Sequence, residues 1–262
     1  KRINIIRQQF PRSKIVSEED MDDIIKDDIS SGKVADHPDS FSDIFPQSVK
    51  DKFEIYSYRS AAAVLYKSFP KQFEDIINAL ESFQITKTMI RIPGGSKGPI
   101  AKYVDTLFDL EKWIETRISA DLSVKLHHAK TNDVFNSYVR EGYLDGHRID
   151  FVSGRVAFDL EWNSKDQTYD RDLYAFSAFH EAGAIDVGVI LTRGSSLDNK
   201  FFKSLGKVLD KDGEKEGTAE VYKKFGASTT WMGKLLYRLD AGRNGGCPVL
   251  AFGITPKCVI DP

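Results

Sequence analysis

The chain has 262 residues, of which 41% are hydrophobic and 29% charged, and its formal net charge is −2. This composition is typical of one large or two small globular domains, and no apolar run is long enough for a membrane span. The two cysteines cannot form a disulfide framework, and the first residues lack the apolar core of a secretory signal, so a reducing cytoplasm is expected. The near-neutral charge counts against nucleic-acid binding, although a local basic surface is sufficient for it.

Residues 1–48 are expected to form an N-terminal helical arm, separate from a main domain over residues 49–262. Ser17 stands before a group of acidic residues, which predicts a capped helix that continues to about Ser30. Proline and glycine residues make the stretch 32–48 linker-like. We expect this arm to serve packing or to support a dimer.

Apolar residues at helical spacing predict three helices in the first part of the main domain. Two of them cover residues 50–69 and 71–84, separated by Pro70, and a longer amphipathic helix covers residues 100–118. Residues 121–147 show no clear pattern. Most of the apolar side chains in the three helices are expected in the core.

A glycine-rich loop at residues 93–98 precedes the third predicted helix. A phosphate-binding Walker loop ends in Gly-Lys-Ser/Thr, which opens the following helix. Here Lys97 is followed by glycine and proline, so an ATP site is rejected. A plain turn is favoured over a loop that places Lys97 and Lys102 beside a phosphate group.

Residues 148–172 contain the most informative pattern of the chain, a predicted hairpin with Ser153-Gly154 as its two-residue turn. Because side chains alternate along a strand, this hairpin has one apolar and one acidic face. The apolar face carries Ile149, Phe151, Val156, Phe158 and Leu160, and the opposite face carries Asp150, Ala157, Asp159 and Glu161. In this register Asp150 lies diagonally from Asp159, within reach of its side chain.

Three clustered carboxylates repel one another and raise each other's pKa unless a cation lies among them. A hard divalent ion with oxygen ligands, such as Mg²⁺, resolves this conflict. A solvent-exposed polar face is the alternative, but such a face would mix Lys, Thr and Ser with its acids. A glycosidase pair of carboxylates fits less well than three acids on adjacent strands, and no nucleophile motif for acyl transfer is present.

The remaining elements predict an α/β fold. A helix over residues 170–182 precedes an apolar strand at 185–191, which implies a parallel pair of strands with a right-handed crossover. A helix at 200–210 follows, and then a helix that starts at Ser228 or Thr229. The last strand is predicted at residues 248–254.

Asp150 followed by Asp159-Leu160-Glu161 resembles the active-site signature of the PD-(D/E)XK nuclease superfamily, with Glu161 where the usual lysine stands. This departure is similar to type II restriction endonucleases of the BamHI and BglII kind, and the likeness extends over residues 50–256, including IDVGVILTR and GGCPVLAFGIT. The resemblance implies a restriction-endonuclease-like central mixed β-sheet flanked by helices in the domain 49–262. It also implies Mg²⁺-dependent, site-specific cleavage of double-stranded DNA by a homodimer, with Mn²⁺ able to substitute and with 5′-phosphate products.

The resemblance implies that Asp150 and Asp159 bind the metal, and that Glu161 orients or deprotonates the attacking water or binds a second ion. Glu115, on the helix predicted before the hairpin, is a candidate further metal ligand, with a solvated helix acid as the alternative. The expected DNA contacts are Asn163, Lys165, Ser228, Thr229, Thr230, Lys234 and Arg243.

Among these contacts, Lys165 is expected to meet a phosphate and Arg243 a base edge. The alternatives are that Lys165 is merely exposed and that Arg243 is bound to its own backbone. Two other functions stay open, a repair or structure-selective nuclease with the same core and a DNA-binding module whose acids are structural.

Overall fold

A mixed six-stranded sheet forms the centre of the protein in a computed structural model that describes residues 32–94 and 97–261. The strands lie in the order β1, β9, β6, β5, β4, β3. Strands β9, β6 and β5 run parallel, and the other neighbours are antiparallel. This arrangement confirms the predicted α/β fold with a central mixed sheet flanked by helices. The strands are β1 (Phe53–Tyr58), β3 (Ile114–His127), β4 (Val134–Ser153), β5 (Val156–Glu161), β6 (Val187–Arg193) and β9 (Val249–Ile254).

Helices cover both faces of the sheet. Phe158 and Val189 belong to one core cluster, whereas Ala157 and Ile190, which alternate with them, belong to another. Strands β5, β6 and β9 are therefore buried along their whole length, as expected for parallel strands. The first cluster includes residues of α3 (Gln47–Lys52), α4 (Ala61–Ser68), α5 (Pro70–Ser82), α6 (Lys87–Arg91), α7 (Pro99–Asp105) and α9 (Asn199–Ser204), and the second includes residues of α8 (Thr168–Glu181) and α10 (Met232–Asp240).

Several short elements complete the described part of the chain. Outside the central sheet, β2 pairs in parallel with β10, and β7 pairs antiparallel with β8. None of the helices described is long and apolar enough to cross a lipid bilayer. The short elements are η1 (Pro38–Ser40), η2 (Ser42–Ile44), β2 (Ile85–Thr86), β7 (Lys207–Leu209), β8 (Glu216–Glu220), η3 (Val221–Phe225), η4 (Pro256–Cys258) and β10 (Val259–Ile260).

The stretch 32–48, predicted to be linker-like, packs against the first core cluster. Phe41 and Phe45 are buried in that cluster, and the ring centroid of Phe45 lies 5.7 Å from that of Phe252. The division between arm and main domain stays a prediction. The helix predicted to continue to Ser30 lies outside the described residues.

Two of the predicted helices are partly wrong. Strand β1 lies within the helix predicted for residues 50–69, because this segment pairs with β9 at the edge of the sheet. In the region 100–118, α7 ends at Asp105 and β3 begins at Ile114. Between them, Asp109 accepts hydrogen bonds from the backbone N–H groups that follow it, and this turn changes the direction of the chain.

The second half of the chain follows the prediction more closely. Helix α8 connects the parallel strands β5 and β6, and β9 is the predicted last strand of the sheet. Helix α9 ends at Ser204, earlier than predicted, because Gly206 with φ +72° leads the chain into β7. Helix α10 begins at Met232, later than the predicted start at Ser228 or Thr229, because the segment before it pairs with the chain that follows β5.

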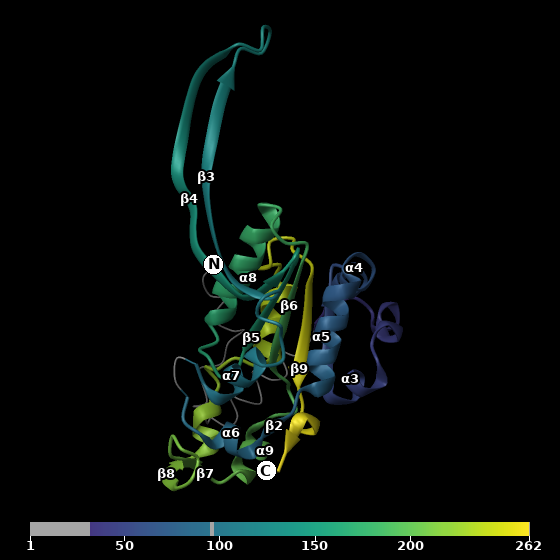
Figure 1. The fold of residues 1–262 in the computed structure, drawn as a ribbon, viewed down its shortest axis with the longest axis vertical. Helices are drawn as coiled ribbons and strands as arrows, with labels where there is room; N and C mark the ends of the chain where they lie inside the picture. Colours follow the sequence, from purple (N-terminus) through teal and green to yellow (C-terminus); the bar gives the residue numbers. More distant parts are fainter. Residues whose placement is uncertain (1–31, 95–96, 262) are drawn as a thin grey trace, which may run out of the picture.

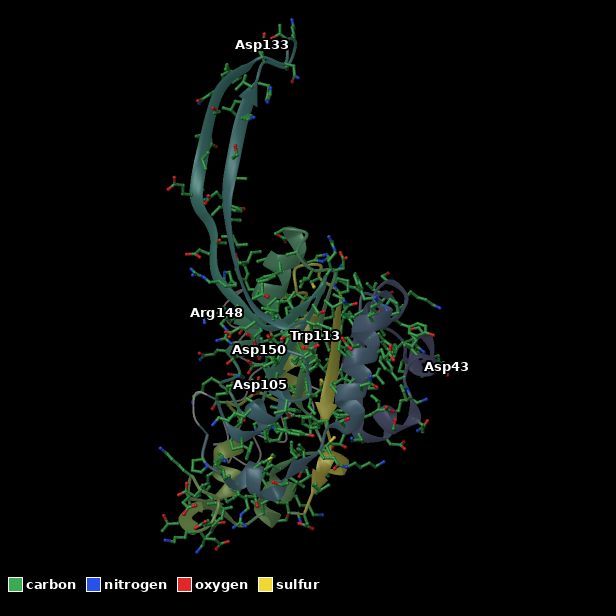
Figure 2. All side chains as sticks on the ribbon, in the orientation of Figure 1. Asp43, Asp105, Trp113, Asp133, Arg148 and Asp150 are labelled. Atoms are coloured by element: carbon green, nitrogen blue, oxygen red, sulfur yellow. The ribbon has the colours of Figure 1, made fainter. Side chains whose placement is uncertain are left out.

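Strands β3 and β4 form a long two-stranded ribbon that extends away from the body of the protein (Figure 1). Asp133 lies at its far end, and Arg148 and Asp150 lie where it joins the body (Figure 2). Most residues of the ribbon beyond Ala120 are exposed on both faces. This explains why residues 121–147 show no alternation in the sequence.

Candidate active site

The hairpin that carries the acids turns one residue later than predicted. Ser153 pairs with Val156, so the two loop residues are Gly154 and Arg155. Gly154 has φ +57°, the positive value that glycine provides at the first position of such a loop. The predicted register is therefore wrong by two residues. A shift of two keeps every side chain on its face, so the acids of β5 remain on the face of Ala157.

The register of β3 against β4 shifts beside the site, so Asp150 and Phe151 together lie opposite Glu115. Such a bulge bends a strand and changes the direction of its side chains. As a result, Ile149 packs in the second core cluster with residues of α8, and not on the face of Phe151 as predicted.

Asp150 and Asp159 are joined through each other's backbone. The N–H of Asp150 donates to Oδ1 of Asp159 at 2.7 Å, and the N–H of Leu160 donates to Oδ2 of Asp150 at 3.3 Å. If the observed register of β4 and β5 is extended by one residue, the two acids are directly opposite, not diagonal as predicted. These bonds hold the two carboxylates side by side near the carboxyl end of β5.

A further acid, Asp172 of α8, lies beside Glu161, and Arg171 contacts both carboxyl groups. Asp159, Glu161 and Asp172 are only 4%, 6% and 2% exposed. One oxygen of each has no hydrogen-bond partner among the described residues, and neither has Oδ1 of Asn163. Buried carboxylate oxygens without partners are costly, and they are typical of a site that receives an ion.

Asp172 is absent from the residues predicted for the site. It lies on the inward stripe of α8, next to Leu173 and one turn before Phe176, both of which are fully buried. Acids are rarely buried unless they are paired or bind a metal. A carboxylate on an apolar helical stripe is therefore the sequence signal that could have found it.

Burial raises the pKa values of all these acids. The pKa of Glu161 is raised to about 9, first by burial and then by the charge of Asp172. Burial and the charge of Asp150 raise the pKa of Asp159 well above its usual range, and burial also raises the pKa of Asp150 and Asp172. Asp150 is open to the adjoining cavity, but the protein around that cavity removes part of its hydration. Without a cation the cluster therefore retains protons, and a bound cation would favour the ionised forms.

A cavity of about 830 Å³ opens at the carboxyl end of β5. Its lining combines the acids Asp150 and Glu161 with the cations Lys97, Arg171 and Lys224. A surface that holds both acids and cations can bind a metal ion and an anionic phosphate together.

Glu115 lies on β3, not on a helix as predicted. Its side chain is 67% exposed, and Oε1 lies 3.6 Å from Nη1 of Arg148. It lines the same cavity as Asp150, and its charge contributes to the raised pKa of Asp150. Its role as a metal ligand stays a prediction.

The predicted DNA contacts fall into two groups. The first lies beside the cavity, because Asn163 lines it and the nearby Lys165 forms a bridge with Thr229 of the segment before α10. Lys165 and Ser228 are exposed, whereas Thr230 is buried and accepts a hydrogen bond from the N–H of Ser164 at 3.1 Å. This first group comprises Asn163, Lys165, Ser228, Thr229 and Thr230.

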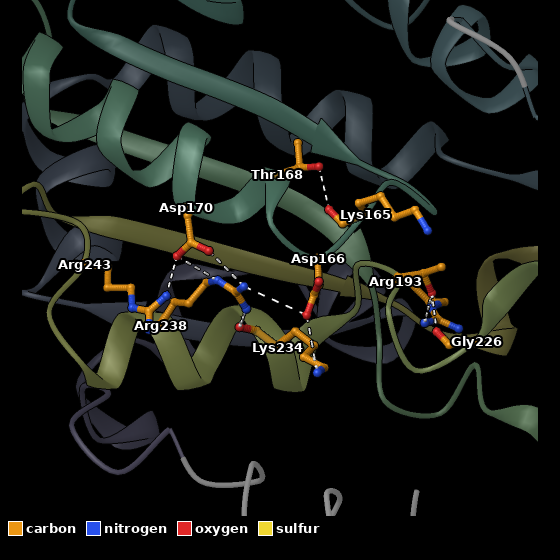
Figure 3. A network of polar contacts seen from close by, with 10 residues as sticks. Lys165, Asp166, Thr168, Asp170, Arg193, Gly226, Lys234, Arg238 and Arg243 are labelled. Atoms are coloured by element: carbon orange, nitrogen blue, oxygen red, sulfur yellow. Dashed lines mark hydrogen bonds and ion pairs between the residues drawn. The ribbon is translucent and has the colours of Figure 1, made fainter. Parts of the chain in front are cut away.

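The second group, Lys234 and Arg243, is held by acids of neighbouring segments (Figure 3). Nζ of Lys234 lies 3.4 Å from Oδ2 of Asp166. Arg243 forms an ion pair with Asp170, which also accepts two hydrogen bonds from Arg238 at 3.0 Å. Arg243 thus binds an acidic side chain and not its own backbone. The DNA contacts of Lys234 and Arg243 stay predictions.

Arg193 at the end of β6 supports the first group and is a residue that the sequence pattern does not reveal. Its guanidinium donates to the backbone oxygen of Thr230 at 3.2 Å and to Oγ1 of Thr229 at 3.1 Å. It also lies over the rings of Phe202 and Phe225. Burial lowers the pKa of Arg193 to about 10. Arg193 therefore fixes the segment before α10 to the sheet that carries the acids.

The acids fit a hard divalent cation whose coordination is completed by other oxygens. Within residues 32–94 and 97–261, no three His, Cys, Asp or Glu side chains converge closely enough to enclose a metal ion. Mg²⁺, however, commonly takes one or two carboxylates and completes its shell with waters and substrate phosphates. The unpartnered oxygens of Asp159 and Glu161, next to the accessible Asp150, match that requirement.

Glu161→Gln is expected to stabilise the metal-free protein at alkaline pH. Because the folded-state pKa of Glu161 is about 9, folded protein holds one proton more than unfolded protein between pH of about 4 and 9. The free energy of unfolding of the wild type therefore falls as pH rises through this window. The amide has no proton to lose, so its curve should be flatter, with a gain of ~1 kcal/mol or more at pH of about 8.

Urea unfolding in excess chelator across this pH range measures the difference. Glu181→Gln, an exposed acid at the end of the same helix α8, is the control and should follow the wild type. Parallel curves for the wild type and Glu161→Gln would refute the prediction.

The family model described as "Restriction endonuclease BglII/BglIII" matches residues 53–254 of the chain. This match begins at the first residue of β1 and ends at the last residue of β9, so it includes every strand of the central sheet. A search of curated proteins finds no match.

Proposed function

The chain belongs to the BglII/BglIII restriction endonuclease family and is a site-specific endonuclease of double-stranded DNA, and from this premise we propose that it is a type II enzyme that requires Mg²⁺ and leaves 5′-phosphates. The observation that supports this proposal most directly is the set of buried carboxylate oxygens without partners at the carboxyl end of β5. They adjoin a cavity that is open to a substrate and contains cationic side chains.

The acids of the hairpin have distinct roles in the proposed reaction. Asp150 and Asp159 would hold the cation, and Glu115 is the further candidate at the cavity wall. A bound Mg²⁺ would supply Lewis acidity toward the scissile phosphate. Glu161 would orient the attacking water and accept its proton as the water oxygen bonds to phosphorus. The 3′-oxygen then leaves, which puts the phosphate on the 5′ end of the product.

We also propose that the active form is a homodimer. Cleavage of a duplex requires two phosphodiester bonds to be hydrolysed, one in each strand. The chain carries a single hairpin with this set of acids in its described part. Two copies related by a twofold axis would place one such site at each strand.

The group of residues beside the cavity is the proposed DNA surface. Lys165 is exposed, and its amine has no hydrogen bond or ion pair with the described residues, so it is available to a phosphate. Asn163 and Ser228 lie near it, on the two bridged segments. Lys234 and Arg243 are proposed as further DNA contacts. To bind DNA, Lys234 must break its ion pair with Asp166, and Arg243 must break its ion pair with Asp170.

Lys165→Ala is expected to weaken binding to every duplex and to reduce the slope of affinity against salt by about one unit, because one phosphate contact is lost. Arg243→Ala is expected to weaken the free energy of binding to the cognate duplex by roughly 1–3 kcal/mol, through the loss of contact with one base pair, and to relax specificity at that base pair. Binding of both variants to cognate and scrambled duplexes across a salt series measures this. An equal loss for both duplexes with Arg243→Ala would contradict its role as a base reader.

The test of the proposed function is incubation of the full chain with plasmid DNA and Mg²⁺, followed by sequencing of the cleaved ends. Discrete fragments with a common sequence and ligatable 5′-phosphates are expected. Smears or nicks would instead favour a repair or structure-selective nuclease with the same core. Binding without cleavage would favour a DNA-binding module whose acids are structural.

A further inference from the structure

Asp172 has two features that a structural acid does not need. It is 2% exposed, and its Oδ2 has no hydrogen-bond partner among the described residues. Its Oδ1 accepts bonds from Nε and Nη2 of Arg171 at 3.0 and 2.9 Å. The adjacent arginine thus satisfies one oxygen and leaves the other oriented within the protein without a donor.

The unpartnered oxygen of Asp172 has a counterpart on β5. Glu161 lies beside Asp172 and is 6% exposed, and its Oε2 likewise has no hydrogen-bond partner in the described part of the chain. Nη2 of Arg171 lies 3.7 Å from Oε1 of Glu161, so one guanidinium is shared between two buried carboxyl groups. One positive charge cannot neutralise two carboxylates, and the Coulomb repulsion between them is larger in a buried setting than in water.

Arg171 is able to leave this position. Its side chain is 67% exposed, and it lines the cavity that Glu161 also lines. A side chain that is mostly in solvent can rotate away at little cost in packing. The two carboxyl groups, by contrast, are fixed by a strand and a helix.

We propose that Asp172 is a cation-binding residue that shares a divalent metal ion with Glu161, and that Arg171 provides the balancing charge when no metal is bound. This inference rests on the proposed metal-dependent function and adds to it a ligand from the crossover helix α8. Two carboxylates with waters and a phosphate oxygen are a sufficient set for Mg²⁺ or Mn²⁺. The proposal makes two opposite predictions for adjacent residues, because Asp172 attracts the metal and Arg171 competes with it.

The test is a titration of the full chain with Mn²⁺ in the absence of DNA, by calorimetry and by the metal-induced rise in unfolding temperature. Asp172→Asn, which keeps the size of the side chain, is expected to lower the Mn²⁺ affinity by about 10-fold or more. Arg171→Gln is expected to raise it, because a competing positive charge is removed. Glu181→Gln, on the same helix and outside the cluster, is expected to match the wild type.

A wild-type Mn²⁺ affinity in Asp172→Asn would overturn the inference, and would leave the proposed function standing if the wild type cleaves DNA with Mg²⁺. If Asp172→Asn does not fold, Arg171→Gln decides, since an unchanged or lower Mn²⁺ affinity in that variant would also overturn the inference. A wild type that neither binds Mn²⁺ nor cleaves DNA would overturn the proposed function together with it.

Discussion

Replacing Asp159 with asparagine is expected to lower the rate of DNA cleavage by about 10³-fold or more, because several kcal/mol of transition-state stabilisation depend on the cation that Asp159 would hold. Asp159 is 4% exposed and accepts the N–H of Asp150 through Oδ1, and no described residue provides a hydrogen-bond partner for its Oδ2. The amide oxygen can still accept the bond from Asp150, so the local fold should survive. The amide cannot supply the negative charge. DNA affinity measured without metal should be equal while Asp159 holds its proton, and higher at a pH at which Asp159 is ionised, since the substitution then removes one charge that repels phosphate.

The matched control for this variant is Asp186→Asn. Asp186 directly precedes β6, at the opposite end of the parallel strands from the site, and it forms an ion pair with Arg155, the residue before β5. This substitution removes one acid from the same sheet and should leave the cleavage rate unchanged. Glu161→Ala should show the same loss of cleavage as the substitution of Asp159. An Asp159→Asn variant that cuts DNA at the wild-type rate would refute the assignment of the site.

The faces of β5 in the acidic hairpin could be predicted from the sequence, but its register against β4 and the face of Ile149 could not. Alternation along a strand has a period of two, so the faces survive the observed shift of two residues. The register depends on which residues form the loop, and Gly154 takes the first loop position because it adopts a positive φ. The bulge opposite Glu115 depends on the pairing of β3 with β4, and no local pattern encodes it.

The strands that could not be predicted from the sequence lie at the edges of the sheet. β1 has apolar residues that also fit a helical stripe, and its pairing with β9, two hundred residues away in the chain, decides its conformation. The ribbon of β3 and β4 is exposed on both faces for most of its length. Its sequence therefore shows no regular alternation of apolar and polar residues from which a strand could be predicted. The central strands β6 and β9 were predictable because both of their faces are covered.

The composition of the site was only partly predictable for a related reason. Asp150, Asp159 and Glu161 are close in sequence, and a hairpin brings them together. Asp172 and Arg193 reach the site through a crossover helix and a neighbouring strand, so their roles follow from tertiary packing. The position of Asp172 on the apolar stripe of α8 marks it as a buried acid, but no local pattern places it beside Glu161.

Removal of divalent metal is expected to abolish cleavage, and Mg²⁺ or Mn²⁺ should restore it. The acids at the site have raised pKa values and unpartnered oxygens, so metal-free protein presents a cluster that retains protons and repels phosphate once these protons are lost. A divalent cation removes both effects, and it should therefore increase DNA affinity as well as the rate. The increase in affinity should be larger at pH of about 8 than at pH of about 6, because at the lower pH more of the acids still hold protons, which compete with the cation.

Calcium separates binding from catalysis in the same experiment. Ca²⁺ accepts the same oxygen ligands with longer and looser coordination, so it should support DNA binding without turnover. Affinity for a cognate duplex and the rate of plasmid cleavage are measured in chelator, Ca²⁺, Mg²⁺ and Mn²⁺, with the wild type and Asp159→Asn side by side. The variant should show a much smaller gain in DNA affinity from Ca²⁺, because part of the cation's ligand set is missing. Full activity of the wild type in excess chelator would rule out the metal-dependent mechanism, and an equal gain from Ca²⁺ in both proteins would remove Asp159 from the proposed cation site.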